Sequence, residues 1–294
     1  MFDFSSTAYS LNLGSAASSL TAGTMELRTA NGLLGSGAAN TSLAIGASAE
    51  LLYSTRSATR SLNSLTLNNS GSVRATSGVL TANSVAFNNL FGGLVHGDGA
   101  KIQFASNVTL ANAGTLRATG ANGAIRFYNP VKTANLGTVD LVSGGRAYLA
   151  NVLTNTGATL TTAGTGAAYE LLNGKIIGGS VAAGALKFTP SGGTLDGVSL
   201  LGPTVSVPAS ASVTFENGST FASGLTLNAN TLLSWNQSGT LSGKTLTFTG
   251  SNPRIYLNAA NASLILASAT TGTRASIFSP TPSAPTLRSR ITAY

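Results

Sequence analysis

Short stretches of alternating apolar and polar residues recur along this chain. Leu65-Thr66-Leu67 and Val108-Thr109-Leu110 each place apolar residues at every second position, which is the period of a β-strand with one buried face. An Asn-x-Gly unit follows each of them, and a second apolar stretch then begins at Val73 or Leu116. Because glycine adopts positive φ without steric cost and asparagine tolerates it, Asn-x-Gly predicts a tight bend between two strands.

These units recur at a constant interval. They begin at Asn69, Asn112 and Asn155, each 43 residues beyond the last. A fixed interval of this size marks a repeat architecture, and it suits two laps of a coil of roughly 20 residues each better than one. The third unit has Thr159 where the others have Val or Leu, and its apolar residue is Leu160. This predicts a local bulge or insertion there.

The alternation continues beyond the three units, and Gly, Asn, Ser or Pro separates almost every pair of stretches. The gaps are too short for crossover helices, which leaves either a sandwich of hairpins or a coil of parallel strands. The long constant period favours the coil. We therefore predict an all-β fold: a single right-handed parallel β-helix, or β-solenoid, with short strands and Gly/Asn corners.

The solenoid is predicted to span residues 1–275, with 1–60 less regular. Ser42-Leu43-Ala44-Ile45-Gly46 and the residues after it read as strand, glycine corner, strand, and a short amphipathic helix over Ala47–Arg60 is the competing interpretation. In the second half, Gly193–Gly197 is echoed by Gly239–Gly243. Residues 276–294 contain three prolines and lose the alternation, so we expect an extended or disordered tail.

Composition supports an elongated β protein. Charged residues are 8% of the chain, against about 25% in an ordinary domain, while the 43% hydrophobic content argues against disorder. The net charge of +8 comes from scattered basic residues without a run, so we expect no specific nucleic-acid partner. There is no cysteine to form a disulfide or thiolate metal site, and no apolar run long enough to span a membrane as a helix.

Candidate catalytic groups are few. Asp98 and Asp140 lie 42 residues apart, so two laps could bring them to one face at roughly 10 Å, near the separation of an inverting glycosidase. The plainer interpretation is two solvated acids in turns. His96 is the only histidine, which excludes a cluster of histidine metal ligands. We predict no enzyme activity, no metal site and no cofactor.

Two weak ligand-contact sites are compatible with the repeat. Arg74 and Arg117 occupy the same phase of the 43-residue interval, and with Lys101 and Arg126 they could form a sparse basic stripe for an acidic polysaccharide. Ordinary surface placement is the alternative. Trp235, together with Tyr256, could form a sugar-stacking platform, whereas packing in the core or at a corner is more usual for aromatic residues.

The repeat units resemble a known group of proteins. Asn-x-Gly-x-Leu-x-x-Thr, then Gly-Thr-Leu-x-Gly followed by Leu-Thr-Leu-Asn and Leu-Ser-Gly-Lys-Thr-Leu-Thr-Phe, are similar to the repetitive passenger regions of bacterial autotransporter and filamentous-haemagglutinin-like surface proteins. The resemblance covers roughly residues 40–270 and rests on the style of repeat. It implies a right-handed parallel β-helix, export to the cell surface, and a role in adhesion or as a stalk.

We therefore expect a non-enzymatic cell-surface or secreted segment that makes weak multivalent contacts with glycans or proteins of a host or neighbouring cell. The start, Met1-Phe2-Asp3-Phe4, lacks the features of a secretory signal, so the chain is expected to be part of a longer exported protein. Two alternatives remain open: a carbohydrate-active enzyme (a polysaccharide lyase or hydrolase) on the same fold, and a purely structural fragment of a larger repeat protein. The sequence does not indicate an oligomeric state.

Overall fold

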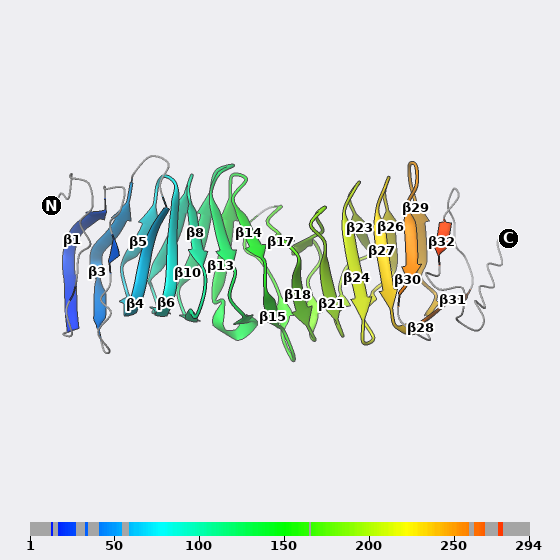
Figure 1. Cartoon of the computed structure of the whole chain (residues 1–294), viewed down its shortest axis with the longest axis horizontal. Helices are drawn as coiled ribbons and strands as arrows, with labels where there is room; N and C mark the ends of the chain where they lie inside the picture. Colours follow the sequence, from blue (N-terminus) through cyan, green and yellow to red (C-terminus); the bar gives the residue numbers. More distant parts are fainter. Residues whose placement is uncertain are drawn as a thin grey trace. The chain divides into compact units, whose positions relative to one another are not determined.

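The computed structural model describes residues 13, 17–27, 33–34, 41–54, 59–164, 166–258, 262–267 and 276–278. In this part of the chain the secondary structure is β-strand, apart from one short 3₁₀ helix. Neighbouring strands run parallel, for example β4 with β6 and β24 with β27 (Figure 1). Stacked laps make a β-solenoid of about 10 turns. The predicted parallel β-helix is confirmed, and the sandwich of hairpins is wrong.

The described residues form two compact units, one within residues 1–151 and 162–169 and the other within 152–161 and 170–294. The elements of the first unit are β1 (Ala17–Leu27), β2 (Leu33–Leu34), β3 (Ser42–Tyr53), β4 (Thr59–Asn69), β5 (Ser72–Ala75), β6 (Val79–Asn89), β7 (Leu94–Asp98), β8 (Lys101–Phe104), β9 (Thr109–Asn112), β10 (Thr115–Thr119), β11 (Ala124–Phe127), β12 (Val131–Lys132), the 3₁₀ helix η1 (Thr133–Asn135), β13 (Thr138–Val142) and β14 (Arg146–Leu149).

The last of the three points at which the chain passes between the units falls within β17 (Tyr169–Leu171). The other strands of the second unit are β15 (Val152–Thr154), β16 (Thr159–Leu160), β18 (Gly174–Ile177), β19 (Ser180–Val181), β20 (Leu186–Lys187), β21 (Gly193–Asp196), β22 (Ser199–Leu200), β23 (Thr204–Val207), β24 (Ser212–Glu216), β25 (Thr220–Phe221), β26 (Gly224–Leu227), β27 (Leu232–Asn236), β28 (Ser238–Ser242), β29 (Thr245–Phe248), β30 (Arg254–Leu257), β31 (Ser263–Ala267) and β32 (Ser276–Phe278).

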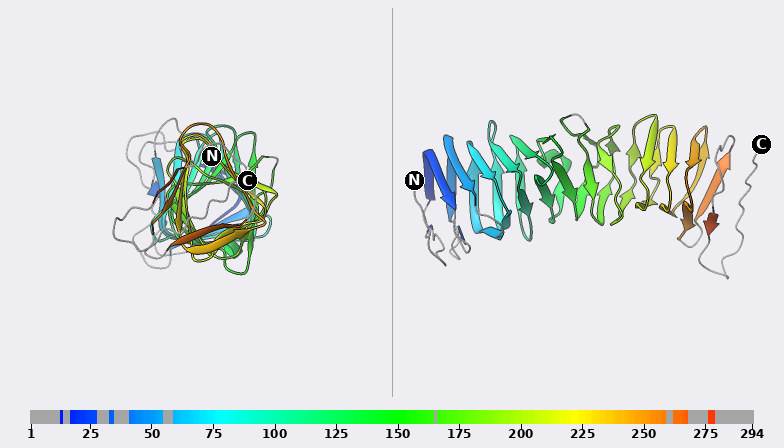
Figure 2. Two further views of the ribbon diagram at one scale, coloured as in Figure 1. Left: turned by 90° about the vertical axis from the view of Figure 1, so that its right-hand side faces the viewer. Right: turned by 90° about the horizontal axis from the view of Figure 1, so that it is seen from above.

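Within each unit, the strands stack in long ladders around the interior of that unit (Figure 2). In the first unit one ladder runs β3-β5-β7-β10-β13 and another β3-β4-β6-β8-β11-β14. In the second, β15-β18-β21-β24-β27-β30-β32 form the longest ladder, beside β16-β19-β22-β25 and β23-β26-β29. Asn69 is paired with Asn89, and Asn89 with Asn112. The 43-residue interval is therefore two laps, as predicted.

A ladder of buried asparagines forms one corner of the first unit. Asn69 and Asn89 are fully buried and Asn112 nearly so. The Asn69 amide donates to Asn89 Oδ1 at 2.7 Å, and the Asn89 amide donates to Asn112 Oδ1 at 2.6 Å. The same amides also donate to backbone carbonyls of the next lap, Leu94 from Asn69 and Thr115 from Asn89. Each side chain thus satisfies polar groups that the corner would otherwise bury unpaired.

The glycines of this corner are required for a different reason from the one predicted. Neither Gly71 nor Gly114 has positive φ. A Cβ at Gly114 would instead lie 2.2 Å from the Gly93 carbonyl oxygen and 2.7 Å from the Asn89 amide nitrogen. The laps approach too closely here for any side chain. In the third repeat unit Gly157 does have positive φ, near 72°, as predicted, and Gly92, in the lap between the first two repeat units, has a φ near 82°.

Nearly all of the described residues between 17 and 69 are in strands. The competing helix over residues 47–60 is wrong, because β3 covers Ser42–Tyr53 and β4 begins at Thr59. The predicted glycine corner at Gly46 lies inside β3, which pairs with β1 through a register shift between Leu20 and Ala22. A bulge therefore bends one continuous strand where a break between two strands was expected.

The predicted insertion in the third repeat unit is present. Asn155 begins a turn closed by a hydrogen bond from the Ala158 amide to its carbonyl, and Leu160 is buried. The echo between Gly193–Gly197 and Gly239–Gly243 is not structural, since β21 and β28 belong to different sheets. Of the predicted tail, the structure describes only Ser276–Phe278, which pair with β30.

Aromatic side chains stack along the interior. Phe104 and Phe127 are register partners with ring centroids 5.6 Å apart, and Phe87 meets Phe104 edge-on at 5.3 Å. In the second unit Phe215 and Trp235 stack at 5.9 Å. All five are buried, and each such side chain contributes about 1.5–3 kcal/mol through burial. Core packing is thus continuous from lap to lap within each unit.

Replacing Asn89 with alanine is expected to destabilise the chain by about 3 kcal/mol, because it removes the middle of the asparagine ladder and leaves buried carbonyls unpaired. Asn88→Ala is the matched control. Asn88 is half-buried and donates only to Asn68 Oδ1, so its loss should cost about 1 kcal/mol. Urea unfolding followed by circular dichroism measures both. Equal losses for the two variants would contradict a special role for the ladder.

Candidate functional site

The predicted phase of Arg74 and Arg117 is confirmed. Arg74 pairs in register with His96, His96 with Arg117, and Arg117 with Asp140, across β5, β7, β10 and β13. All four are only partly buried and lie on the outer face of this ladder. Because successive rungs are about 4.8 Å apart, the two arginines are about 10 Å from each other. We call these four residues the outer row.

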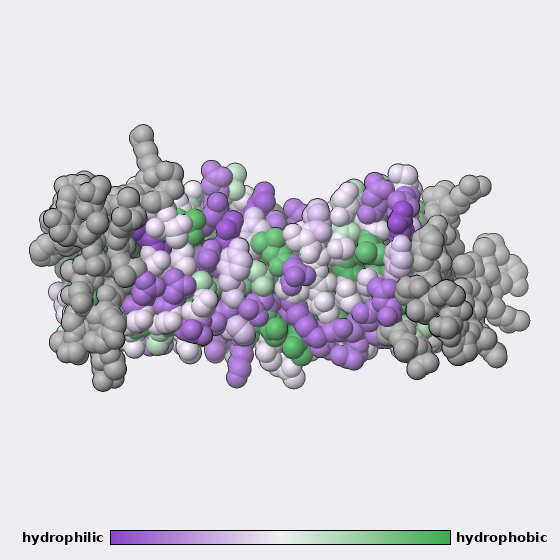
Figure 3. Space-filling model, viewed as in Figure 1, coloured by the Kyte–Doolittle hydropathy of each residue, from purple (hydrophilic) through white to green (hydrophobic). Residues whose placement is uncertain are grey.

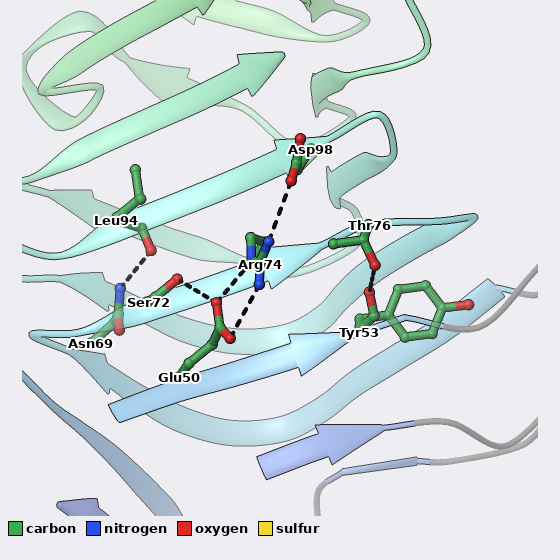
Figure 4. Close-up of polar contacts among 8 residues, drawn as sticks. All are labelled: Glu50, Tyr53, Asn69, Ser72, Arg74, Thr76, Leu94 and Asp98. Carbon is green, nitrogen blue, oxygen red and sulfur yellow. Dashed lines mark hydrogen bonds and ion pairs between the residues drawn. The ribbon is translucent and has the colours of Figure 1, made fainter. Parts of the chain in front are cut away.

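Carboxylates neutralise the cations of the outer row. The Arg74 guanidinium lies between Glu50, at 2.8 Å from its Nε, and Asp98, at 3.4 Å from its Nη1 (Figure 4). The hydrogen bond to Glu50 is the main reason that the pKa of Arg74 is raised. Arg117 Nε donates to Asp140 Oδ2 at 2.8 Å. The row and its immediate partners thus carry mixed charge, which does not make a basic surface.

The four-residue basic stripe proposed from the sequence does not form. Lys101 and Arg126 lie on β8 and β11, in a different ladder from Arg74 and Arg117. They are not register partners of each other either, since Lys101 pairs with Ala124 and Arg126 with Gln103. Arg126 instead lies over the Tyr148 ring, with its Cζ 5.4 Å from the ring centroid. The 43-residue interval thus predicted correctly that Arg74 and Arg117 share a row, but it did not predict that Lys101 and Arg126 lie in a different ladder.

Trp235 cannot form an exposed platform. Its side chain is 1% exposed and stacks on Phe215 in the core. The indole Nε1 donates to the Ser263 carbonyl at 3.2 Å, which satisfies its polar group on burial. Tyr256, the other half of the suggested platform, is only partly buried and lines a surface groove.

The acids that were considered as a catalytic pair are each engaged in an ion pair. Asp98 and Asp140 lie on the same ladder, Asp98 facing Thr119 in register and Asp140 facing Arg117. Asp98 is held by Arg74 and Asp140 by Arg117. Each of the two carboxylates is thus paired with an arginine of a neighbouring lap, and the two acids are not register partners of each other.

A second charged cluster was missed from the sequence. Asp196 and Glu216 are register partners on β21 and β24, and the Lys175 ammonium bridges them, 2.7 Å from Asp196 Oδ2 and in contact with Glu216 Oε1. The hydrogen bond from Lys175 lowers the pKa of Asp196, and the hydrogen bond to Asp196 raises the pKa of Lys175. Lys175, Asp196 and Glu216 lie about one lap apart in the sequence, and this spacing is the signal from which the cluster could have been predicted.

His96 is partly buried within the outer row, and its Nε2 lies 2.9 Å from Thr119 Oγ1. Its pKa is lowered, mainly because burial disfavours the charged ring and also because Arg117 and Arg74 repel it, while Asp98 and Asp140 oppose the shift. Over the described residues, no three His, Cys, Asp or Glu side chains gather in a way that could hold a metal ion.

A surface groove of about 500 Å³ lies in the second unit. It is lined by residues of β27 and β30 and of the corners beside them: Asn230, Thr231, Leu232, Asn252, Arg254, Tyr256 and Asn258. Most of the surface that lines the groove is apolar, and the polar groups along it include three amides, one guanidinium and one phenol. No sequence motif indicated the groove, because its residues come from two laps and their meeting depends on register.

Comparisons of this chain with protein-family models, with curated proteins and with solved structures found no match. In the portion of the chain that the structure covers, no helix has the length and apolar character to cross a membrane.

The lowered pKa of His96 predicts a pH dependence of stability. A base with a depressed pKa in the folded state stabilises the fold fully above its unfolded pKa, about 6.5, and this contribution is lost as pH falls below that value. The urea concentration at the midpoint of unfolding should therefore decrease when the pH is lowered from about 7.5 to about 5.5. His96→Gln, which does not titrate but can still bond Thr119, should reduce that fall. An unchanged fall would contradict the assignment.

Proposed function

We propose that this chain is a non-enzymatic surface or extracellular segment that makes weak multivalent contacts. The observation that carries the proposal is the stacking of outward side chains in rows, one residue per lap, as in Arg74, His96, Arg117 and Asp140. Such rows present outward polar groups about 4.8 Å apart over several laps. Individually weak contacts then add, because linked sites bind with a high effective concentration. The resemblance in repeat style to bacterial surface proteins supports the same location and role.

The outer surface suits polar partners. Among the described residues, the large apolar side chains that are exposed are scattered: Leu90, Phe91, Tyr128, Val142, Leu201 and Ile265. On the face seen in Figure 3, hydrophobic patches are small and separated by hydrophilic residues. A large contiguous apolar patch would favour a stable protein interface, whereas a mixed polar surface favours hydroxyl-rich or charged partners such as glycans.

A carbohydrate-active enzyme remains the second candidate, on one observation. Asp196 and Glu216 are register partners on neighbouring rungs, and the rung spacing of about 4.8 Å is close to the separation of about 5–5.5 Å between the carboxyl groups of a retaining glycosidase. However, a general acid needs a raised pKa, and Lys175 lowers the pKa of Asp196. The geometry of the ion pairs therefore favours a structural role for these acids.

If the proposal holds, beads coated densely with the chain should retain cell-surface glycans or matrix proteins at least about 100-fold better than the same amount of chain presented singly. If the beads retain no glycan, matrix protein or anionic polymer, the purely structural fragment is favoured instead.

The enzyme alternative is tested on acidic and neutral polysaccharides by the release of reducing ends or unsaturated products. We expect no turnover above the background of heat-denatured chain. Turnover that is lost in Glu216→Gln or Asp140→Ala, but kept in a control such as Asn88→Ala, would overturn the non-enzymatic proposal.

A further inference from the structure

The outer face of β8 and β11 in the first unit carries two cations and an amide. Lys101 and Gln103 alternate with buried residues on β8, and Arg126 does so on β11, so all three side chains point outward. Gln103 is the register partner of Arg126, and Lys101 is one rung and two residues away from Arg126. The Cα atoms of the two cations are therefore about 8 Å apart. The strands β6, β8, β11 and β14 contain no Asp or Glu.

These two cations are not neutralised by the protein. Within the described residues, neither Lys101 nor Arg126 has an ion-pair partner. The acids of the outer row contact Arg74 and Arg117 instead, on the other ladder. Lys101 and Arg126 are both partly buried, and a cation that loses water without gaining an anion is costly. An external anion on this face is therefore favoured.

The Arg126 guanidinium is held in place by an aromatic ring. Tyr148 is the register partner of Arg126 on β14, and Arg126 Cζ lies over its ring, 5.4 Å from the centroid. A cation–π contact of this kind uses the charge of the guanidinium and none of its N–H donors. Arg126 Nε is buried and has no hydrogen-bond partner among the described groups. A guanidinium that is already positioned suits a planar carboxylate, which it can bind through two N–H donors.

An exposed aromatic side chain lies beside these cations. The ladder continues one residue past β11, since the Tyr128 amide donates to the Phe104 carbonyl at 2.9 Å. Because Phe127 is buried in the core, Tyr128 points outward by strand alternation, with its Cα about 7 Å from that of Arg126. Tyr128 is 40% exposed. We call Lys101, Gln103, Arg126 and Tyr128 the β8–β11 face.

The chemistry of this face narrows the class of ligand. The Gln103 amide both donates and accepts hydrogen bonds, as sugar hydroxyls do. An aromatic ring such as that of Tyr128 packs against the apolar face of a sugar ring. Two cations are a poor footprint for nucleic acid, whose binding depends on several phosphate contacts. A saccharide that carries carboxylates matches the cations, the amide and the ring together.

We propose that the β8–β11 face binds an acidic saccharide. Arg126 and Lys101 contact its carboxylates, Tyr128 packs against a sugar ring, and Gln103 bonds to hydroxyl groups. This inference rests on the proposed function and specifies one of its weak contacts. The outer row, whose cations are neutralised by acids, takes no part in it.

The test uses the full chain and a trisaccharide of galacturonic acid, with binding followed by ligand-observed NMR titration. Arg126→Gln should weaken binding at least about tenfold, the effect of losing a hydrogen bond to a charged group, and Lys101→Gln about threefold. Tyr128→Ala should weaken it at least about threefold and Tyr128→Phe much less, because the ring face supplies the contact. The galactose trisaccharide should bind more weakly than the acidic one, and the double variant Lys101→Gln, Arg126→Gln should remove that difference.

Two variants outside the face serve as controls. Lys132→Gln removes the same unit of charge from β12, where Lys132 is exposed and belongs to a different sheet. Phe91→Ala removes an exposed aromatic ring from a corner of the first unit. Both should bind the acidic trisaccharide as the unaltered chain does. Circular dichroism checks that Tyr128→Ala keeps the fold, and Tyr128→Phe with Arg126→Gln maintains the test if that variant unfolds.

Three results would overturn the inference: no binding by the unaltered chain, unchanged binding by Arg126→Gln, or an equal loss in Lys132→Gln. A single-stranded oligonucleotide bound more tightly than the trisaccharide would also overturn it. If coated beads retain glycans or proteins and the β8–β11 variants behave like the unaltered chain, the assignment to this face is wrong and the proposed function still stands.

Discussion

The constraint on which this structure depends is that every lap must satisfy the backbone of the next. Parallel strands do so along the straight sides of the coil, but at a corner the chain turns and its polar groups lose their regular partners. In the first unit the asparagine ladder supplies those partners. The Asn89 amide donates both to the next asparagine and to the Thr115 carbonyl, so a buried side chain joins one lap to the next where the sheet hydrogen bonds end.

The same corner explains why glycine and asparagine occur together in the repeat unit. Because Gly114 has no side chain, its backbone approaches the Gly93 carbonyl to a distance that a Cβ would prevent. This approach brings the Asn89 amide within hydrogen-bond distance of groups on two laps. A larger residue at the glycine would push the laps apart and break the side-chain ladder. Asparagine is suited to the position because its amide both donates and accepts. Spacing between laps, turn geometry and polar satisfaction are therefore one requirement.

The sequence was sufficient to predict the class of fold because strand alternation and a constant interval are local and periodic signals. It was insufficient where register decides. Asn89 belongs to the ladder but is followed by Leu90-Phe91-Gly92-Gly93 in place of x-Gly, so the intermediate lap was invisible to a search for Asn-x-Gly. The constant interval was enough to place Arg74 and Arg117 in one row. It was not enough to identify the carboxylates that neutralise them, Glu50, Asp98 and Asp140, because spacing alone does not give the register between laps.

Register also decides what the surface can do. Most charges on the described laps contact opposite charges on neighbouring laps, as Lys175 contacts Asp196 and Glu216, and a charge engaged in this way has less capacity to attract an external partner. Such ion pairs are weak individually at an exposed surface, but they disfavour a slipped pairing because a slip would separate the paired charges. Register therefore sets both which charges are neutralised and which outward polar groups repeat from lap to lap, and the multivalent contacts proposed above depend on those repeated groups.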